Sequence, residues 1–453
     1  MDVERAGRGQ DIEVTRLLAA HAATLRWEDI PAEVVHDAKR ALVDFEGVAL
    51  AGSSEPLSAG LHRVYASRMG AAEARVIGTQ RRTDAMTAAF LNGTAGHALD
   101  FDDTHADFFY HGTVPVAPAV WALGEMIGAS GREMIVAFVA GWDVGARLAR
   151  ALNPSVYRKG WQNTPTSGTF AATAAAGRLL GLDVDAMRHA LGMAASQASG
   201  SRQNHGSMGK PFQVGKASMN GVLAALAARE GITSSPIAIE APLGFAALTT
   251  PEFDLARAVD GLGASFELRR NMFKPYACCL PHHTVIDAMF ALRREHGLTS
   301  ATLEKALCRI PAISLDSSNI AEPATGLEGK FSFQHSAAVA LVDDAAGLAQ
   351  YTDERVRDAS LAAVRRKFQL VAEPSLGAGH CVIEAQRTDG ETVEVRIDHA
   401  RGHLANPLSD EAIDQKFRAN TAGIRDDVWQ TRALEALWTL DRAADVARIA
   451  ALL

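Results

Sequence analysis

The most reactive stretch of the sequence is NGTAGHALDFDDTH, residues 92–105, in which three aspartates fall within four positions after an apolar segment. Carboxylates this close repel one another in a low-dielectric site, so a helix N-terminus, hydrogen bonds or cations must offset the repulsion. His111 follows, and an imidazole beside carboxylates suits proton transfer near neutral pH. The alternative is structural: Asp102 and Asp103 cap a helix, and His97 is a core histidine with satisfied hydrogen bonds. The spacing alone leaves both interpretations open.

Two other segments could present a cation to an anionic substrate. One is NHGSMGKPFQVGK, residues 204–216, and the other is FKPYACC, residues 273–279. Both contain glycine or proline, which is typical of loops that position binding groups. Lys210 and Lys274 are therefore candidate carboxylate-binding residues. For any single lysine, a solvated surface position is the alternative.

The sequence carries no recognisable nucleotide or metal signature. It has no GxxxxGK[ST] loop, no GxGxxG after a predicted strand, no HExxH and no paired CxxC. His282 and His283 are adjacent, and successive side chains point apart on a helix or a strand, so a shared metal there is not expected. We therefore expect a site without a cofactor or a metal ion.

Composition argues against several classes of protein. The 453 residues carry a formal charge of −8, and lysine and arginine form no block, so a nucleic-acid partner is not expected. The first residues lack an apolar signal segment, and no apolar run reaches the ~18 residues of a membrane helix. The four cysteines are too few for a disulfide scaffold, and Cys278 and Cys279 are adjacent, a spacing that disulfide geometry disfavours. We expect a soluble, cytoplasmic protein with no membrane partner.

Helices must position most of these residues. Apolar residues recur at intervals of three and four from Val34 to Ala49, which predicts one buried helix face. Stretches rich in alanine and glycine, such as FAATAAAG, predict close helix packing in preference to a cleft lining. Similar periodic patterns predict further helices over 84–99, 118–127, 133–152, 170–180 and 184–195.

The pattern changes near residue 271. Alternating residues predict a strand over 308–313 and a hairpin over 380–398 that turns at Asp389-Gly390. Helical patterns recur between these strands, over 284–295 and 354–368. This mixture is typical of an α+β unit.

These patterns together predict a mainly α fold. We expect a large all-helical domain built from both ends of the chain, residues 1–270 and 406–453, with a smaller α+β lid domain over residues 271–405. The helices after residue 406 are predicted to pack back on the first part of the chain.

The whole chain resembles one family. NGTAGHALDFDDTH is similar to the signature of the MmgE/PrpD family, which includes 2-methylcitrate dehydratase, cis-aconitate decarboxylase and iminodisuccinate epimerase. The similarity continues in order through DFEGVALAG, GWQNTPTSGTFAATAAAGRLLGL, GSMGKPFQVGKAS, KPYACC, PHHTVIDA, TGLEGKFSFQHSAAVAL and NPLSDEAIDQKF. The resemblance implies a helical domain with an α+β lid, assembled as a homodimer. It also implies a metal-free site between domain and lid that takes small di- or tricarboxylates.

The resemblance implies a role for each matching residue. The family's catalytic residues fall on Asp100, Thr104, His111, Lys210 and Lys274. His111 would transfer a proton, and the two lysines would stabilise negative charge that develops on a substrate carboxylate. Asp100 would orient a histidine or act as the base, and Thr104 would hydrogen-bond the substrate.

Three departures from the family pattern bear on the reaction. Gln162 and Gln213 stand where many members have histidines, and Cys279 stands where the decarboxylase and dehydratase branches have one. An amide hydrogen-bonds a carboxylate but does not transfer a proton at neutral pH, and we predict that all three residues bind substrate. We therefore expect a metal-independent lyase most like 2-methylcitrate dehydratase. The alternatives are an epimerase of a dicarboxylate such as iminodisuccinate and a cis-aconitate-type decarboxylase.

Overall fold

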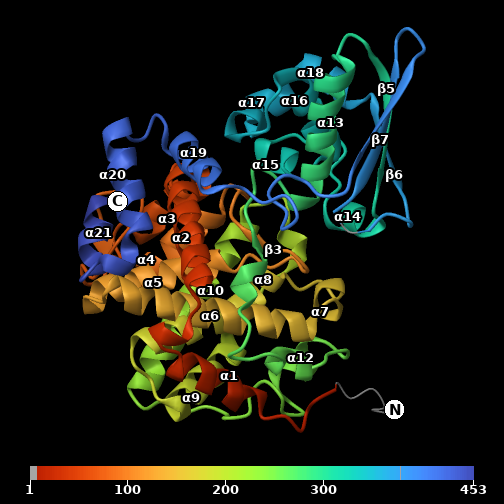
Figure 1. Ribbon diagram of the computed structural model, residues 1–453. Coiled ribbons are helices and arrows are strands. Elements are labelled where there is room, and N and C mark those ends of the chain that lie inside the picture. The colour runs from red at the N-terminus through yellow and green to blue at the C-terminus, as the bar shows by residue number, and fades with distance from the viewer. Residues whose placement is uncertain (1–7, 378) are drawn as a thin grey trace.

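Helices dominate the chain, and the mainly α fold predicted from the sequence is confirmed. The computed structural model describes residues 8–377 and 379–453. Figure 1 shows a broad stack of helices with a smaller unit of helices and a sheet above it. We call residues 8–270 and 406–453 the helical part and residues 271–405 the lid. Each has its own apolar core, while the exact boundaries between them stay a prediction.

The helical part is built from fifteen of the described helices, in addition to short 3₁₀ turns. The first twelve are α1 (Val14–Thr24), α2 (Ala32–Gly52), α3 (Pro56–Tyr65), α4 (Ala85–His97), α5 (Thr113–Ile127), α6 (Gly131–Leu152), α7 (Ser155–Arg158), α8 (Asn163–Leu179), α9 (Val184–Gln197), α10 (Gly209–Arg229), α11 (Phe245–Thr249) and α12 (Ala256–Val259). The last three are α19 (Asp410–Thr421), α20 (Asp427–Trp438) and α21 (Val446–Leu452). Short strands β1 (Ala74–Arg75) and β2 (Arg82–Thr83) pair antiparallel beside them, so this part is not purely helical.

Small residues let the central helices approach closely, as the sequence predicts. The alanines of α8 are completely buried in the core of the helical part. A Cβ atom on Gly141 of α6 would lie 2.4 Å from the carbonyl oxygen of Ala171 in α8. A Cβ atom on Gly221 of α10 would lie 2.4 Å from the Cβ atom of Ala172. These stretches therefore serve packing, because larger side chains would push α6 and α10 away from α8.

Gly141 provides a direct test of this packing. The Gly141→Ala variant should lose about 1–3 kcal/mol in free energy of unfolding, because its methyl group has no space beside the Ala171 carbonyl. Gly60 in α3 is the matched control, since the nearest atom to its added Cβ would be 3.8 Å away. Gly60→Ala should be neutral or stabilising by up to ~1 kcal/mol, because alanine favours helices more than glycine does. Urea denaturation measures both changes, and equal stability of the two variants would contradict the packing described.

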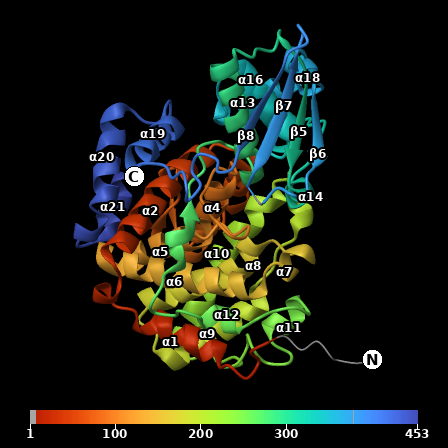
Figure 2. The ribbon, with the colours of Figure 1, turned by 45° about the vertical axis from the view of Figure 1, so that its right-hand side comes forward.

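The C-terminal helices lie against the N-terminal ones. Figure 2 shows α19 and α20 beside α2, although they come from opposite ends of the chain, and α21 packs on α5. Phe417 of α19 is buried against Gly47 of α2, where an added Cβ would be 3.0 Å from the phenylalanine ring. Both ends of the chain therefore contribute to one core, as the sequence predicts.

The lid is a four-stranded sheet with helices packed on one face (Figure 1). The strands lie in the order β6 (Phe368–Ala372), β5 (Leu303–Ile310), β7 (Cys381–Arg387) and β8 (Thr392–Ile397). Strands β5 and β6 are parallel, and the other two pairs are antiparallel. The helices are α13 (His283–His296), α14 (Ala312–Ser317), α15 (Gly326–Gly329), α16 (Phe333–Asp343), α17 (Asp353–Arg357) and α18 (Ala359–Arg365).

Alternation along the strands explains the two faces of this sheet. Cys308 and Ile383 are buried beneath the helices, while Arg309 on the other face pairs with Glu384 and Glu394 at 3.0 and 3.2 Å. A sheet with one apolar and one polar face needs helices on one side only. The hairpin predicted over 380–398 is confirmed as β7 and β8.

Several predicted boundaries are wrong. The single helix expected over 354–368 is two helices, because the Asp358 side chain accepts hydrogen bonds from the Ser360 and Leu361 N–H groups and starts α18. Phe368 then begins β6. The strand expected over 308–313 ends at Ile310, since Pro311 precedes α14. Helix α5 begins at Thr113, five residues before the predicted start.

Candidate active site

The loop between α4 and α5, residues 98–112, carries most of the predicted catalytic residues. Near its start lies Asp100, whose φ of 49° is in the left-handed region that aspartate tolerates better than most residues. Further on, strand β3 (Thr104–His105) pairs antiparallel with β4 (Asn271–Met272). This pairing joins the loop to the segment that carries Lys274. Segments far apart in the sequence therefore meet at one place.

Two ammonium groups converge on the Asp100 carboxylate. The Lys210 Nζ atom, at the start of α10, lies 2.6 Å from Asp100 Oδ1. The Lys274 Nζ atom lies 3.1 Å from the same oxygen and donates a hydrogen bond of 2.9 Å to the Asp100 carbonyl. All three side chains are buried. The sequence segments that suggested candidate cations thus supply two of them to one carboxylate.

The charges of this group follow from its burial and its neighbours. Burial raises the pKa of the Asp100 carboxyl, but the two ammonium groups outweigh burial and hold that pKa well below its usual range. Burial lowers the pKa of Lys274, but the carboxylates of Asp100 and Asp102 outweigh it, and the net shift is upward. Asp100 therefore stays ionised between the two lysines, and Lys274 stays charged at neutral pH. Both Nζ atoms can also bind a carboxylate of a substrate.

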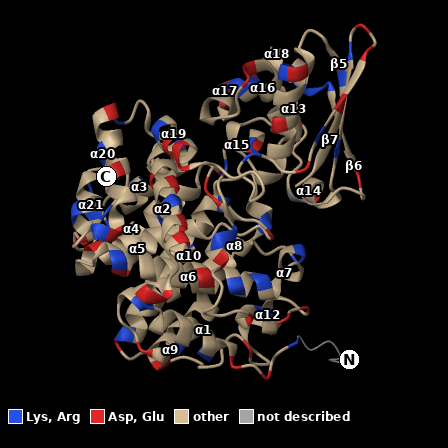
Figure 3. Cartoon of the chain, in the orientation of Figure 1, with Lys and Arg blue, Asp and Glu red and all other residues tan. Residues whose placement is uncertain are grey.

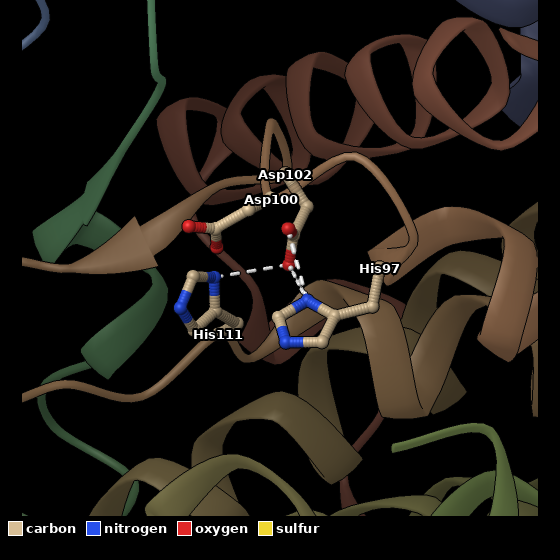
Figure 4. Close-up of side chains that lie close together, drawn as sticks. All are labelled: His97, Asp100, Asp102 and His111. Carbon is tan, nitrogen blue, oxygen red and sulfur yellow. Dashed lines mark hydrogen bonds and ion pairs between the residues drawn. The ribbon is translucent and has the colours of Figure 1, made fainter. Parts of the chain in front are cut away.

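Asp102 bridges two histidines (Figure 4). Its Oδ1 and Oδ2 atoms lie 3.0 and 2.9 Å from His97 Nδ1. Its Oδ2 atom also lies 3.0 Å from His111 Nδ1, with a less well-aligned direction than the His97 contact. The two imidazole rings meet edge to face, with centroids 4.8 Å apart.

Protonation states within this trio can be inferred from the pKa shifts. Burial raises the pKa of Asp102, but the two histidines outweigh burial and hold it well below its usual range, so the carboxylate is ionised. Burial lowers the pKa of His97 to about 4 and lowers that of His111 as well, so both rings are neutral at pH 7. A carboxylate only accepts hydrogen bonds, so His97 carries its proton on Nδ1, and the 3.0 Å contact with Asp102 favours the same tautomer for His111. In that tautomer the Nε2 atom of His111 is an unprotonated base.

The structural alternative for the acidic run is not supported. Neither Asp102 nor Asp103 accepts a hydrogen bond from a helix N–H group among the described residues; the cap of α5 is Gly112. Asp103 instead accepts hydrogen bonds from the Thr113 hydroxyl and, at 2.6 Å, from the Asn271 amide. Burial raises the pKa of Asp103 to about 7. The neighbouring aspartates thus have opposite pKa shifts.

Seven of the eight predicted site residues line one cavity between the helical part and the lid. Its wall includes Asp100, Thr104, His111, Gln162, Lys210, Lys274 and Cys279. Gln213 lies behind this wall and donates a hydrogen bond from its Nε2 atom to Gln162 Oε1. Burial raises the pKa of the Cys279 thiol to about 11, so this group is neutral at pH 7. The roles of all eight residues stay predictions.

Other residues of the cavity were missed in the sequence. The wall also includes Phe109, Tyr157, Thr164, His205, Leu280 and Phe331. His205 stacks on Phe331, with ring centroids 5.9 Å apart, and Lys210 Nζ lies 5.2 Å from the centre of the same ring. His205 lies in the segment 204–216, which indicates a site through its lysines, and the pattern of that segment does not predict a role for His205. Tyr157 and Phe331 had no local signal, because distant segments bring them here.

The cavity is small and enclosed by the lid. Its volume is about 30 Å³, whereas pockets that hold small molecules usually exceed ~300 Å³. Lys274, Cys279 and Phe331 come from the lid or its first residues. A di- or tricarboxylate can therefore enter only if the lid moves or these side chains rearrange.

The C-terminal part of the chain holds the site loop from behind. Lys416 of α19 donates a 2.7 Å hydrogen bond to the carbonyl of Phe101, between the two aspartates of the site. The same Nζ atom lies 2.7 Å from Asp44 of α2. Both side chains are buried. The loop is thus fixed to helices from both ends of the sequence.

The four residues drawn in Figure 4 also have the composition of a metal site. One ligand atom from each of His97, Asp100, Asp102 and His111 lies within 4.8 Å of the others. However, Lys210 and Lys274 already bring two positive charges to Asp100. Both histidines use Nδ1 to contact Asp102. A divalent cation would have to displace these contacts and would be repelled by the lysines, so the donor set does not fit a metal ion.

Lysine and arginine are interspersed with aspartate and glutamate over the face shown in Figure 3. Within the described residues, no helix has the length and apolar character needed to cross a bilayer.

Known proteins resemble this chain over almost its full length. Residues 16–258 match the family model described as the MmgE/PrpD N-terminal domain, and residues 276–442 match the MmgE/PrpD C-terminal domain. The cis-aconitate decarboxylase of Aspergillus terreus (strain NIH 2624 / FGSC A1156) is 28% identical over 471 residues, covering 97% of this chain and 96% of that protein. The cis-aconitate decarboxylase-like protein oryM of Aspergillus oryzae is 28% identical, covering 97% of each chain. The cis-aconitate decarboxylase of Mus musculus is 30% identical, covering 74% of this chain and 71% of the mouse protein.

Proposed function

Because this chain belongs to the MmgE/PrpD family and is a lyase, we propose that it removes a proton next to a carboxylate of a small di- or tricarboxylate, without a metal ion. One observation supports this more than any other. His111 is held by Asp102 as a neutral base, in a cavity where two ammonium groups face one carboxylate. The base takes the proton, and the two ammonium groups stabilise the negative charge that develops on the substrate.

The residues divide this work between them. Lys210 and Lys274 bind the carboxylate next to the reacting carbon, and Asp100 holds both ammonium groups in place. The electron pair left when His111 Nε2 takes the proton spreads onto that carboxylate, which strengthens its contacts with the lysines. Thr104 lines the same wall and can hydrogen-bond the substrate. Asp102 stabilises the imidazolium that forms on His111, a role that the sequence suggested for Asp100.

Dehydration of a hydroxy acid such as 2-methylcitrate is the reaction we place first. The C–H bond breaks towards His111 and the C–O bond to the hydroxyl breaks, giving a double bond. The imidazolium proton then combines with the departing hydroxide to form water, so His111 returns to its neutral state. This reaction needs the neutral base that the cavity provides.

Decarboxylation of cis-aconitate is the second candidate, and the names of the relatives favour it. In this reaction a C–C bond breaks to release carbon dioxide, and the remaining carbanion must receive a proton. A protonated His111 could supply that proton. At neutral pH the protonated form is scarce, because burial lowers the pKa of His111.

The pH dependence of turnover separates these two reactions. If His111 acts as a base, kcat/KM should rise with pH and level off below the ordinary histidine pKa of ~6.5, since the pKa of His111 is lowered. If protonated His111 is the acid, kcat/KM should fall as pH rises through the same range. Initial rates between pH 4.5 and 8 distinguish the two, with the range chosen around that ~6.5 value. A flat profile would contradict both roles.

A panel of acids tests the proposed function directly. Citrate, 2-methylcitrate, cis-aconitate and iminodisuccinate are incubated with the protein in deuterated buffer. Alkene absorbance from a hydroxy acid indicates dehydration, and release of carbon dioxide from cis-aconitate indicates decarboxylation. Deuterium incorporation without a net product indicates the epimerase alternative. Absence of any turnover or binding across the panel would contradict the proposed function.

Two wider properties are also proposals. The family resemblance supports a homodimer, and the sequence supports a cytoplasmic location. Light scattering coupled to gel filtration measures the first, and fractionation of the source cells measures the second.

A further inference from the structure

Two glutamines on the cavity wall form a directed pair. Gln162 is 3% exposed and lines the cavity, while Gln213 lies behind it. The Gln213 Nε2 atom donates a hydrogen bond to Gln162 Oε1. The direction of this bond decides which end of the Gln162 amide faces the substrate. The direction of this bond in turn depends on which way the oxygen and nitrogen of the Gln213 amide point.

The main chain of Ser201 fixes the orientation of Gln213. The Ser201 N–H donates a 3.0 Å hydrogen bond to Gln213 Oε1, and the Ser201 carbonyl accepts a 3.1 Å hydrogen bond from Gln213 Nε2. The Asn204 amide donates to Gln213 Oε1 as well, at 3.2 Å. A backbone N–H can only donate and a backbone carbonyl can only accept, so the Gln213 amide cannot flip without losing both bonds.

The segment that carries Ser201 is held to the segment of Gln162. Trp161 and Ser201 form an antiparallel bridge, and the Gln162 N–H donates a 3.2 Å hydrogen bond to the Gly200 carbonyl. Gln162 also directly precedes α8, so its backbone is held at the start of a buried helix. The backbone of Ser201 therefore fixes the Gln213 amide, and Gln213 in turn fixes the orientation of the Gln162 amide at the cavity wall.

We propose that Gln162 presents its Nε2–H group to a substrate carboxylate and that Gln213 is a positioning residue that holds this amide in place. Among the described residues, Gln162 Nε2 has no hydrogen-bond partner, whereas Gln162 Oε1 already accepts from Gln213. The free end of the amide is therefore a donor, which suits a carboxylate oxygen and disfavours an ammonium group. This inference rests on the proposed function and adds a third, uncharged contact to those from Lys210 and Lys274.

The charge-free nature of this contact has a consequence for the substrate. The two ammonium groups alone would attract any anion of the right size. A donor fixed at one place on the wall selects an acid with a second carboxylate at matching distance from the first. The arrangement therefore favours di- and tricarboxylates over monocarboxylates.

The Gln213→Glu variant tests the orientation. Glutamate accepts hydrogen bonds only, so the Gln162 amide must turn its Nε2–H towards Glu at this position and present Oε1 to the cavity. The dissociation constants of citrate, 2-methylcitrate and cis-aconitate, measured by calorimetry, should rise about 10- to 100-fold for the acid that binds. KM should rise similarly, with a smaller change in kcat. Gln203→Glu is the matched control, since Gln203 is exposed and close in sequence, and its affinity should match that of the wild type.

A double-mutant cycle separates positioning from added charge. Gln162→Leu removes the donor, and it should weaken binding by a similar 10- to 100-fold. If Gln213 acts through Gln162, adding Gln213→Glu to Gln162→Leu should cause little further loss. Independent, additive losses would overturn the inference and leave the proposed function standing. If the wild type binds none of the three acids, the proposed function fails first, and the inference fails with it.

Discussion

Replacing Asp102 with asparagine should lower kcat by about 10²–10⁴-fold with a much smaller change in KM. The ionised Asp102 accepts a hydrogen bond from His97 Nδ1 and lies 3.0 Å from His111 Nδ1, and a neutral amide cannot serve both contacts with a negative charge. The amide also cannot stabilise the imidazolium that forms when His111 takes a proton. The Asp102 charge raises the pKa of His111, so the rise of kcat/KM with pH should move to lower pH in the variant. Steady-state kinetics across pH measure both effects.

The neighbouring aspartate provides the control for that experiment. Asp103 is equally buried, but burial raises its pKa to about 7, and its hydrogen bonds run to Thr113 and Asn271. The Asp103→Asn variant should therefore keep kcat within about tenfold of the wild type. The Asp102 substitution should also add little to His111→Ala, since the two residues act as a unit. Asp102→Asn with normal kcat and an unmoved pH profile would remove Asp102 from the mechanism.

Replacing Lys274 with methionine should lower kcat/KM by about 10²–10³-fold. Methionine keeps the length of the buried chain but removes the ammonium group that lies 3.1 Å from Asp100. Lys210 is then the single ammonium group left beside Asp100, and the carboxylate of the substrate and the charge that develops on it lose one of their two cationic contacts. The carboxylate of Asp100 keeps one partner at 2.6 Å, so the fold should persist.

A second lysine in the same region serves as the comparison. Lys216 lies on α10, outside the cavity wall, and its Nζ atom contacts Met219. Lys216→Met should retain kcat/KM within about tenfold of the wild type. Circular dichroism confirms that both variants are folded before their rates are compared. Equal activity of the Lys274 and Lys216 variants would contradict the proposed role of Lys274.

Much of the site could be predicted because its residues lie in recognisable stretches. His111, Lys210 and Lys274 could be predicted from their segments, Asp100 and Thr104 from the family resemblance, and the structure places all five around one cavity. Their mutual contacts could not be predicted, because they depend on how the loop after α4 turns. Asp102 shows this limit clearly. An aspartate at this position could either cap a helix or take part in catalysis, and only its contacts with two imidazole rings distinguish these roles.

Gln213 shows the same limit for the contacts of a side chain, and the lid helices show it for the ends of an element. Gln213 was predicted to bind substrate, yet its position behind Gln162 is fixed by hydrogen bonds to the backbone of Ser201. Periodicity located helical segments over 354–368, but the cap at Asp358 and the strand that begins at Phe368 follow from tertiary contacts. Local patterns therefore indicate the type of an element better than its ends or its partners.

The contact of Lys416 with Phe101 sets an order of events for a newly made chain. The loop that carries the base emerges from the ribosome well before α19, because Lys416 follows Phe101 by 315 residues. Until then Asp44 lacks the ammonium group that pairs with it, and the Phe101 carbonyl lacks its donor. A chain whose synthesis stops before Lys416 would thus hold every predicted catalytic residue and still be without the group that braces their loop.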